Sequence, residues 1–444
     1  MIREFGRKLV DAALSRGADQ AEAYVRRERG LGVEVKGQKV ESLEASTTMG
    51  YSIRLIRDGR LGFSFSTNPA EIMRVIESAL EASRYTEPDA FNGLPAKAEP
   101  SAVATFDNET ASISESAAVE LTMLLERSAF SEDRRIAKIR KAAGHFGSSD
   151  TAIVNSLGIS VEYPSTFVSA QIMAVAEEGS ESQAGWDYEG SRFLRDVSFE
   201  RVGKNAARRA ISILGAEKTT PARGFVLLDS SVAYEFLSIL SASLSAEAVQ
   251  KGKSMLAQRK GDVVMSPLVN VVDNGLMVGK TGSRPVDAEG VPTTNKTLIE
   301  RGVLKGFLFN TYCARKGGGV STGNAVRSGH AGLPVVGPTN FFIEPAEMLD
   351  AVPFDSLVAA VDSGIYVIET MGMHTANPIS GDFSVGASGL RIEGGRIGRP
   401  FKEAIISGNI LDLFRNIRLV GDDLKFYGSI GSPTLLIEGI DISG

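Results

Sequence analysis

The segment Tyr51-Ser-Ile-Arg-Leu-Ile-Arg-Asp-Gly-Arg-Leu-Gly-Phe-Ser-Phe65 alternates apolar and polar residues on both sides of an Asp-Gly pair. A period of two is typical of a β-strand that buries one of its faces. Asp58-Gly59 is favoured at the centre of a tight hairpin, because both central residues of that turn need a positive φ. The segment therefore predicts an antiparallel hairpin. Directly upstream, Leu31–Leu43 predicts two more short strands, folded back at Lys36-Gly37.

Helices are predicted on both sides of these strands. In residues 2–16 the apolar residues recur at helical spacing, and Gly17 follows as a stop signal. A second helix is predicted to begin at Pro69, directly after Asn68, because proline suits the first turn of a helix. We therefore expect a first α+β unit, residues 1–105, in which antiparallel strands carry a helix at each end.

Two further units are predicted downstream. Residues 86–108 hold three prolines among small and polar residues, which is typical of a linker. A helix, three alternating segments and a helix over Phe199–Leu214 then predict a central α+β unit, residues 106–220, with a boundary near Pro221. Residues 221–444 are rich in glycine and in predicted hairpins, and form a strand-rich C-terminal domain. The predicted fold is α+β, with helix-flanked antiparallel sheets followed by that domain.

Composition excludes several classes of protein. The 444 residues include 48 Lys and Arg against 54 Asp and Glu, and this formal charge of −6 argues against binding to nucleic acid phosphates. A single cysteine, Cys313, excludes an internal disulfide framework and is typical of a reducing compartment. The first ten residues lack the apolar segment of a signal peptide, and Glu235 and Glu247 interrupt the longest largely apolar segment. We expect a cytoplasmic protein that binds neither nucleic acid nor membrane.

The residues alone offer little catalytic equipment. His145, His330 and His374 are the only histidines, and none has a second ligand at a spacing that would present both to one metal ion. We interpret them as loop or surface imidazoles, and Cys313 as a small buried residue, although Arg315 could lower the pKa of its thiol. A carboxylate pair, Asp382 with Glu369, is conceivable for acid–base chemistry, but such pairs are usually structural.

One segment is similar to a phosphate-binding loop. Asn274-Gly-Leu-Met-Val-Gly-Lys-Thr follows an apolar strand, but Gly275 and Gly279 enclose three residues where a P-loop needs four. The sequence therefore does not support nucleotide binding.

Two glycine-rich segments are the remaining candidates for a binding site. They are Lys316-Gly-Gly-Gly-Val-Ser-Thr-Gly-Asn and Asn377-Pro-Ile-Ser-Gly-Asp-Phe-Ser-Val-Gly-Ala-Ser-Gly. Backbone without side chains can approach another backbone closely, which suits recognition of an extended peptide. The alternative interpretation is an irregular connection between hairpins. The candidate substrate-facing residues in these segments are Gly318, Gly319, Asn324 and Asp382.

These last motifs also carry a family resemblance, together with others spread over nearly the whole chain. The chain resembles the TldD/PmbA family, and within it the PmbA branch, also called TldE. Besides the hairpin at Tyr51–Phe65, the similar segments are Gly290-Val-Pro-Thr-Thr-Asn, Leu298-Ile-Glu-Arg-Gly-Val-Leu-Lys-Gly-Phe, Ser321-Thr-Gly-Asn, Ile406-Ser-Gly-Asn-Ile-Leu-Asp and Gly431-Ser-Pro-Thr-Leu-Leu-Ile.

The resemblance implies a metalloprotease system of two kinds of subunit. TldD-type members carry His-Glu-x-x-x-His on a helix and a cysteine near the C-terminus, which together bind zinc; the glutamate serves as general base. PmbA-type members lack this set and act as the partner subunit. The pair cleaves unfolded peptides, in particular an antitoxin and a microcin precursor. A link to DNA gyrase arises through those toxins and implies no contact with DNA.

This chain departs from the zinc-binding pattern at each position. By the resemblance, Ser238 and Ser243 stand where the two histidines would be, and Ile239 stands where the glutamate would be. Near the C-terminus, Tyr427-Gly-Ser-Ile-Gly contains no cysteine. Serine hydroxyls are poor zinc ligands and isoleucine cannot accept a proton. We therefore expect no catalytic residue and no metal site in this chain, and zinc in a TldD-type partner.

The resemblance thus implies a PmbA/TldE-type, non-catalytic subunit of a cytoplasmic metalloprotease that degrades or processes unfolded peptides. The expected partners are a TldD-type subunit and the peptides, and the isolated chain is expected to form a homodimer. Two alternatives stay open. One is a self-sufficient, homodimeric metallopeptidase whose metal site uses His145, His330 and His374 with Asp or Glu. The other is a protein that binds peptides without cleaving them.

Overall fold

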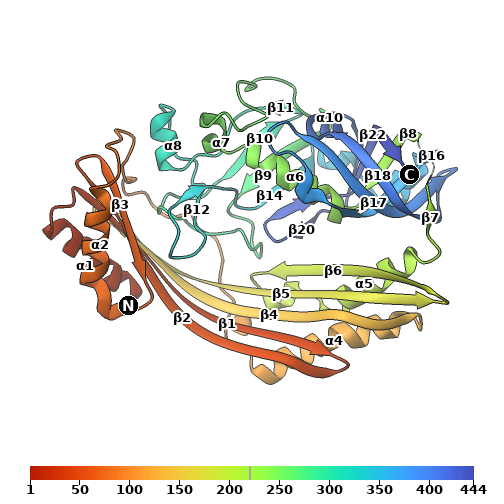
Figure 1. Ribbon diagram of the computed structural model, residues 1–444, viewed down its shortest axis with the longest axis horizontal. Coiled ribbons are helices and arrows are strands. Elements are labelled where there is room, and N and C mark those ends of the chain that lie inside the picture. The colour runs from red at the N-terminus through yellow and green to blue at the C-terminus, as the bar shows by residue number, and fades with distance from the viewer. Residues whose placement is uncertain (220–221) are drawn as a thin grey trace.

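The computed structural model describes residues 1–219 and 222–444. Its first half forms one six-stranded antiparallel sheet with the strand order β3-β2-β1-β4-β5-β6. The strands are long and curved, and the C-terminal part of the chain lies on their concave side (Figure 1). The strands are β1 (Gln20–Lys36), β2 (Lys39–Arg57), β3 (Arg60–Ser66), β4 (Ile136–Asn155), β5 (Ser160–Glu178) and β6 (Glu181–Ser191).

Both predicted hairpins are present in this sheet. Arg57 pairs with Arg60, and between them Asp58 and Gly59 have φ values of 50° and 70°, as the Asp-Gly turn predicted. The upstream turn lies one residue later than predicted, at Gly37-Gln38, and the strands that it joins are 17 and 19 residues long rather than short. Gln38 tolerates a positive φ of 57° there because its backbone N–H and side-chain amide bind groups on the neighbouring helix α4 (Glu115–Glu132).

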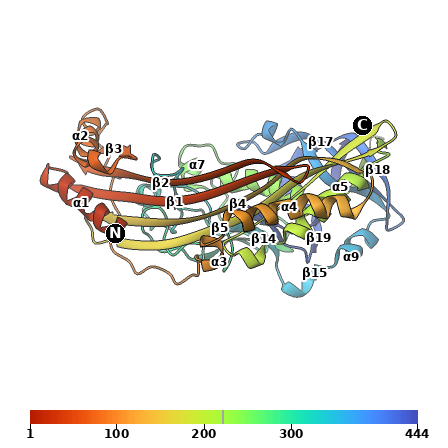
Figure 2. The same cartoon turned by 90° about the horizontal axis from the view of Figure 1, so that it is seen from below.

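Helices pack on the sheet at two places. At one end lie α1 (Ile2–Ser15) and α2 (Ile72–Ser83), the latter preceded by a 3-10 turn, η1 (Pro69–Glu71), that Asn68 caps as the sequence predicted. At the other end, α4 and α5 (Phe199–Ser212) cover the face that points away from the C-terminal part (Figures 1 and 2). Two short helical segments complete this half: α3 (Asn108–Ala111) and η2 (Leu194–Asp196).

The predicted linker, residues 86–108, contains no helix or strand except at its last residue, Asn108, which begins α3. It runs past the C-terminal part, where the backbone N–H of Ser101 donates to the carbonyl of Pro285 (3.1 Å). Strands from the first two predicted units share one continuous sheet, so the boundary between residues 105 and 106 stays a prediction. The boundary predicted near Pro221 lies outside the described residues.

The C-terminal part is strand-rich, as the sequence predicted. One sheet has the order β15-β19-β22-β8-β16-β17-β18-β7, and β22 pairs in addition with β18. Its strands are β7 (Glu217–Lys218), β8 (Ala222–Leu228), β15 (Ala351–Val352), β16 (Ser363–Met371), β17 (Asp382–Glu393), β18 (Arg396–Asn409), β19 (Ile417–Gly421) and β22 (Leu435–Ser443).

A second sheet and a short ribbon complete this part. The six-stranded sheet has the order β11-β10-β9-β14-β21-β20, and β12 pairs with β13. These strands are β9 (Val269–Asn274), β10 (Asn295–Glu300), β11 (Val303–Leu304), β12 (Ala325–Val326), β13 (Val335–Val336), β14 (Phe341–Pro345), β20 (Lys425–Tyr427) and β21 (Ile430–Ser432).

The largest apolar core of the molecule joins both C-terminal sheets to α6 (Ser230–Ser243). Phe236 of α6, for example, meets Phe383 of β17 edge-on, with 4.8 Å between ring centroids. The remaining helices are short and lie around this core: α7 (Ala246–Gln250), α8 (Thr311–Lys316), η3 (Met348–Asp350), α9 (Phe354–Ala359), η4 (Met373–Thr375) and α10 (Ile410–Arg415). Across residues 1–219 and 222–444, no helix is both long and apolar enough to cross a membrane.

Candidate functional site

The family resemblance assigns the zinc motif to α6, and the first turn of this helix is bonded to other parts of the molecule. The N-cap residue, Asp229, is buried and accepts from the backbone N–H of Ser231 (2.9 Å). Arg209 of α5 donates to Asp229 (2.9 Å), and the hydroxyl of Tyr366 donates to it as well (2.5 Å). Burial alone would raise the pKa of Asp229, but the Arg209 charge and the hydrogen bonds hold it below its ordinary value. Asp229 is therefore an ionised anchor between the two halves.

The three positions on α6 that the family resemblance assigns to the zinc motif make contacts within the fold. Ser243 is fully buried and its hydroxyl donates to the carbonyl of Pro378 (3.2 Å), while Ile239 packs against the large apolar core. The backbone carbonyl of Ser238 accepts from the hydroxyl of Ser241 (2.7 Å). This set offers neither an imidazole nor a carboxylate, so the residues present do not fit a catalytic zinc ion.

An aromatic pocket opens beside α6, between this helix and the inner face of the long sheet. Its cavity measures about 420 Å³. Tyr234 of α6 stacks on Tyr427 of β20, with 4.5 Å between ring centroids and 20° between ring planes. Trp186 of β6 meets Tyr427 edge-on at 5.7 Å. Met173 of β5 and Tyr188 of β6 extend the lining. We call this cavity the aromatic pocket.

The phenols of the aromatic pocket are neutral at ordinary pH. Burial raises the pKa of Tyr234 to about 12 and raises that of Tyr427 as well. The hydroxyl of Tyr427 lies 3.3 Å from that of Ser230, at the start of α6. The acidic residue of the lining, Asp187, is paired with Lys425 of β20 and accepts from Asn205 of α5 (3.1 Å). The pocket therefore presents aromatic surface and little free charge. Its polar tips are the indole N–H of Trp186 and the phenol hydroxyls of the tyrosines.

Two carboxyl groups lie close to the same helix. Glu235 of α6 accepts from Thr370, and Glu369 of β16 accepts from Ser388 (3.5 Å). Burial raises the pKa of Glu235; the Thr370 hydrogen bond lowers it in part and the charge of Glu369 raises it further. Burial also raises the pKa of Glu369, against a smaller opposing effect of Arg209. Both carboxyl groups therefore hold a proton more readily than an exposed glutamate does.

The four candidate substrate-facing residues do not form one site. Gly318 and Gly319 are exposed and follow α8, whereas exposed Asp382 begins β17, and these two elements lie well apart (Figure 1). Asn324 is fully buried, and its amide donates to Asp273 (2.8 Å) and to the carbonyl of Gly337 (3.1 Å). The side chain of Asn324 therefore holds loop segments together, and the role of the other three residues stays a prediction.

The structure also separates the other residues considered from the sequence. His145 lies on β4, His330 lies against Phe65 (6.0 Å between ring centroids), and His374 is exposed in η4. In the described part of the chain, no three His, Cys, Asp or Glu residues come together as metal ligands. Glu369 pairs with Ser388 on β17, six residues from Asp382, which is roughly 20 Å along a strand. These two carboxylates therefore do not act as a pair.

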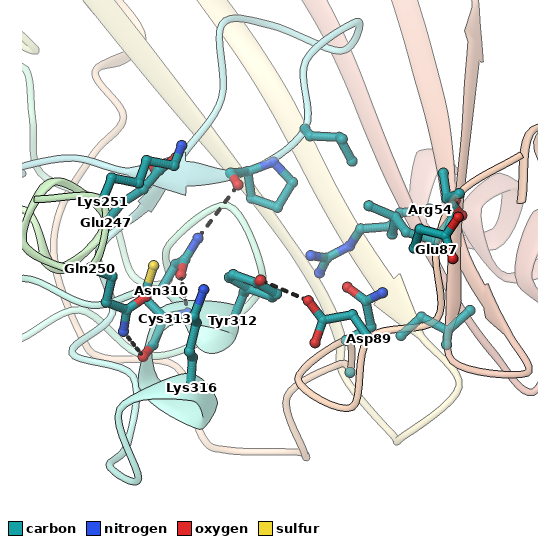
Figure 3. A pocket seen from close by; sticks show the side chains of 17 residues that line it. Arg54, Glu87, Asp89, Glu247, Gln250, Lys251, Asn310, Tyr312, Cys313 and Lys316 are labelled. Carbon is teal, nitrogen blue, oxygen red and sulfur yellow. Dashed lines mark hydrogen bonds and ion pairs between the residues drawn. The ribbon is translucent and has the colours of Figure 1, made fainter.

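A second cavity, also of about 420 Å³, lies where α7 and α8 approach β2 and the linker (Figure 3). Its lining includes hydrogen-bonded polar side chains: the hydroxyl of Tyr312 donates to Asp89 (2.8 Å), and the amide of Gln250 donates to the carbonyl of Cys313 (2.8 Å). Cys313 itself is buried, and burial raises the pKa of its thiol to about 11. The thiol is therefore protonated at ordinary pH and is no nucleophile. The segment 274–281 has no helix after its strand and does not form a P-loop.

Reasoning from the sequence missed the residues of the aromatic pocket. Trp186, Tyr234 and Tyr427 come from three distant segments, and no spacing connects them. One signal was available, because Trp186 is the only tryptophan in the chain. Tyr427 stood inside a segment noted only for its lack of cysteine.

The chain belongs to the PmbA/TldA metallopeptidase family. Three family models match in order: domain 1 at residues 21–83, the central domain at 108–214 and the C-terminal domain at 221–444. This confirms the resemblance and the α+β fold inferred from the motifs.

Relatives match over nearly the full length. The metalloprotease PmbA of Escherichia coli O157:H7 is 28% identical, with 99% of this chain and 97% of the relative covered. A TldD homologue of Haemophilus influenzae is 26% identical over 89% and 86% of the two chains. A crystallised Thermotoga maritima protein, described as a candidate modulator of a DNA gyrase, has a TM-score of 0.91 at 28% identity, with both chains covered completely. TldE of Thermococcus kodakarensis shares the fold (TM-score 0.91, 23% identity, 99% and 100% covered).

Proposed function

We propose that this chain is a PmbA/TldE-type, non-catalytic subunit that works with a TldD-type metalloprotease on unfolded peptides in the cytoplasm. The observation that carries the proposal is the composition of α6. Ser238, Ile239 and Ser243 stand at the zinc-motif positions, and Ser243 and Ile239 are engaged in packing. A helix without zinc ligands needs a partner that supplies the metal and the general base.

The family membership supports the metallopeptidase context, and the long sheet supports a role in enclosing the substrate. In this proposal the concave sheet and the C-terminal part form a wall of a chamber that admits unfolded peptide and excludes folded proteins by size. The subunit role, the partner and the antitoxin or microcin-precursor type of substrate are parts of the proposal.

Reconstitution tests this function. The purified chain, a TldD-type protein with His-Glu-x-x-x-His, and their mixture are each incubated with an unfolded peptide, with and without a zinc chelator. We expect cleavage by the mixture only, and none with chelator. The matched control is a TldD-type variant whose motif glutamate is glutamine, which should leave the mixture inactive. Presenting one substrate sequence in folded and unfolded form tests the chamber, because equal cleavage of both would contradict it.

The two alternatives predict different results in the same assay. A self-sufficient homodimeric metallopeptidase would carry stoichiometric zinc and cleave the peptide without the TldD-type chain. A peptide-binding protein would bind the peptide tightly, insensitive to chelator, and no mixture would cleave it. Either result would replace the proposed subunit function.

A further inference from the structure

The aromatic pocket joins surfaces from both halves of the molecule. The long sheet contributes Trp186, Tyr188 and Met173, and the C-terminal part contributes Tyr234 and Tyr427. Its volume of about 420 Å³ lies within the range of roughly 300–1,000 Å³ that is typical of ligand pockets. A flat aromatic or long apolar side chain gains most from such a lining, because aromatic rings attract one another in stacked and edge-to-face arrangements.

The charges around the aromatic pocket disfavour a cationic ligand. Arg209 already lies over the ring of Trp186 (6.0 Å), and Lys425 lies over the ring of Tyr427 (5.2 Å). The nearby carboxylates are taken, since Asp187 is paired with Lys425 and Asp229 with Arg209. Lys141, the cationic residue of the lining, is paired with Glu34 (3.4 Å). A lysine or arginine side chain would therefore meet the charges of Arg209, Lys425 and Lys141, and Asp187, the carboxylate of the lining, is already paired. A neutral side chain avoids this repulsion.

The polar tips of the pocket are available to a ligand. Within residues 1–219 and 222–444, the indole N–H of Trp186 and the hydroxyls of Tyr188 and Tyr234 form no hydrogen bond with the protein. These three groups are also not fully buried, so a ligand can reach them. An indole N–H donates, and a phenol hydroxyl can donate or accept. These groups can bind the main-chain amides that flank a side chain held in the pocket.

We propose that the aromatic pocket binds one aromatic side chain, of the phenylalanine type, of an unfolded peptide. This gives the non-catalytic subunit a direct part in selecting substrate, and it rests on the proposed function for its peptide ligand. The ring packs among Trp186, Tyr234 and Tyr427, and the indole N–H and the phenol hydroxyls bind the neighbouring peptide backbone. The pocket lies beside α6, so the chain positions the peptide with the helix on which a TldD-type subunit would carry its metal ligands.

Intrinsic fluorescence tests the proposal on the full-length chain alone. Trp186 is the only tryptophan and lines the pocket, so its emission reports occupancy directly. The probes are three capped pentapeptides, Gly-Gly-X-Gly-Gly, with X as phenylalanine, alanine or lysine; none absorbs with tryptophan. We expect the emission of Trp186 to change in a saturable way with the phenylalanine peptide. The other two peptides should bind at least about tenfold more weakly, because they lack the aromatic side chain that the pocket would bury. Equal responses to all three peptides would overturn the proposal.

Variants at Tyr234 locate the binding and keep Trp186 as the reporter. Tyr234→Ala removes the stacked ring and should abolish the preference for phenylalanine, whereas Tyr234→Phe keeps the ring and should retain it. Tyr85→Ala, a change at an exposed tyrosine, is the matched control and should bind like the unmodified chain. Circular dichroism establishes that each variant is folded. A preference that survives in folded Tyr234→Ala would overturn the proposal.

The peptide-binding test and the reconstitution assay can fail independently of each other. Cleavage by the mixed subunits without any phenylalanine preference in this chain would leave the proposed function standing and refute the pocket. Selective binding by the chain, with no cleavage by the mixture, would support the pocket and refute the metalloprotease role.

Discussion

The side-chain amide of Asn324 binds Asp273, a carboxylate without exposed surface that also accepts from the backbone N–H of Thr339 (2.5 Å). We expect Asn324→Ala to lower the free energy of unfolding by about 1–3 kcal/mol, because it leaves a buried acceptor without one of its partners. Urea unfolding followed by circular dichroism measures this loss. Asn295→Ala removes an exposed amide and is the control, with an expected change within about 0.5 kcal/mol. Equal stability of both variants would contradict a structural role of Asn324.

The raised pKa of Glu235 gives a prediction about pH. A carboxyl group with a raised folded-state pKa stabilises the protein fully below its unfolded pKa of about 4.3, and this contribution disappears as pH rises through the folded-state value. Glu235→Gln keeps a partner for Thr370 and cannot ionise. The variant should therefore gain stability relative to the unmodified chain as pH rises from about 4 toward neutrality. Urea unfolding at a series of pH values measures the difference.

Glu200→Gln is the control for that series. Lys204 holds the pKa of Glu200 below its ordinary value, so this carboxylate stabilises the protein above its unfolded pKa. Glu200→Gln should therefore lose stability relative to the unmodified chain as pH rises, which is the opposite of the change expected for Glu235→Gln. The same sign in both variants would show that the series reports a general effect of pH and not the surroundings of Glu235.

At the scale of elements, the sequence predicted those features that depend on local chemistry. The Asp58-Gly59 hairpin, the cap at Asn68 and the irregular linker follow from residues that are neighbours in the chain. The length of β1 and β2 could not be predicted, because the sheet extends through residues that are exposed and polar on both faces near Arg27 to Arg29. Pairing with β4 on the other side holds that part of β1 in the sheet.

The packing of α5 on α4 depends on a glycine, Gly203. A Cβ atom there would lie 2.4 Å from the carbonyl oxygen of Leu125 and 3.0 Å from the Cβ of Ser128. We expect Gly203→Ala to lower the free energy of unfolding by about 1–3 kcal/mol, because two helix backbones must move apart. Gly306→Ala, where no atom lies within 4 Å of the added Cβ, should change it little. Thermal unfolding of the two variants tests this, and equal midpoints would contradict the close approach.

At the scale of the whole molecule, the contacts that join the two halves were invisible in the sequence. Tyr427 contacts Trp186, although more than half of the chain's residues lie between them in sequence. Arg54 on β2 likewise donates to Glu289 in the C-terminal part. No motif or periodicity links such residues, because folding alone brings them together. The family resemblance assigned the zinc-motif positions to α6, and that assignment stays a prediction. The aromatic pocket beside α6 became evident only in three dimensions.

Four buried charges lock the long sheet to the C-terminal part. Arg54 donates to Glu22 (2.7 Å) and to Glu289 (2.8 Å), and Arg327 donates to Glu22 (2.5 Å); Glu22, Glu289 and Arg327 are at most 1% exposed at their side chains. We expect Arg54→Ala to lower the free energy of unfolding by about 3–5 kcal/mol, because it leaves the charge of Glu289 buried without its cation.

Removing the Arg54 side chain should also change how the molecule unfolds. Since Arg54 bonds to both halves, Arg54→Ala should separate the unfolding of the sheet from that of the C-terminal part. Urea unfolding followed by circular dichroism, which reports all strands, and by the emission of Trp186, which reports contact between the halves, should then give two different midpoints. Arg84→Ala breaks an exposed pair with Glu81 and is the control; it should cost at most about 1 kcal/mol and leave the midpoints coincident. Coincident midpoints and unchanged stability in Arg54→Ala would mean that apolar packing alone holds the halves together.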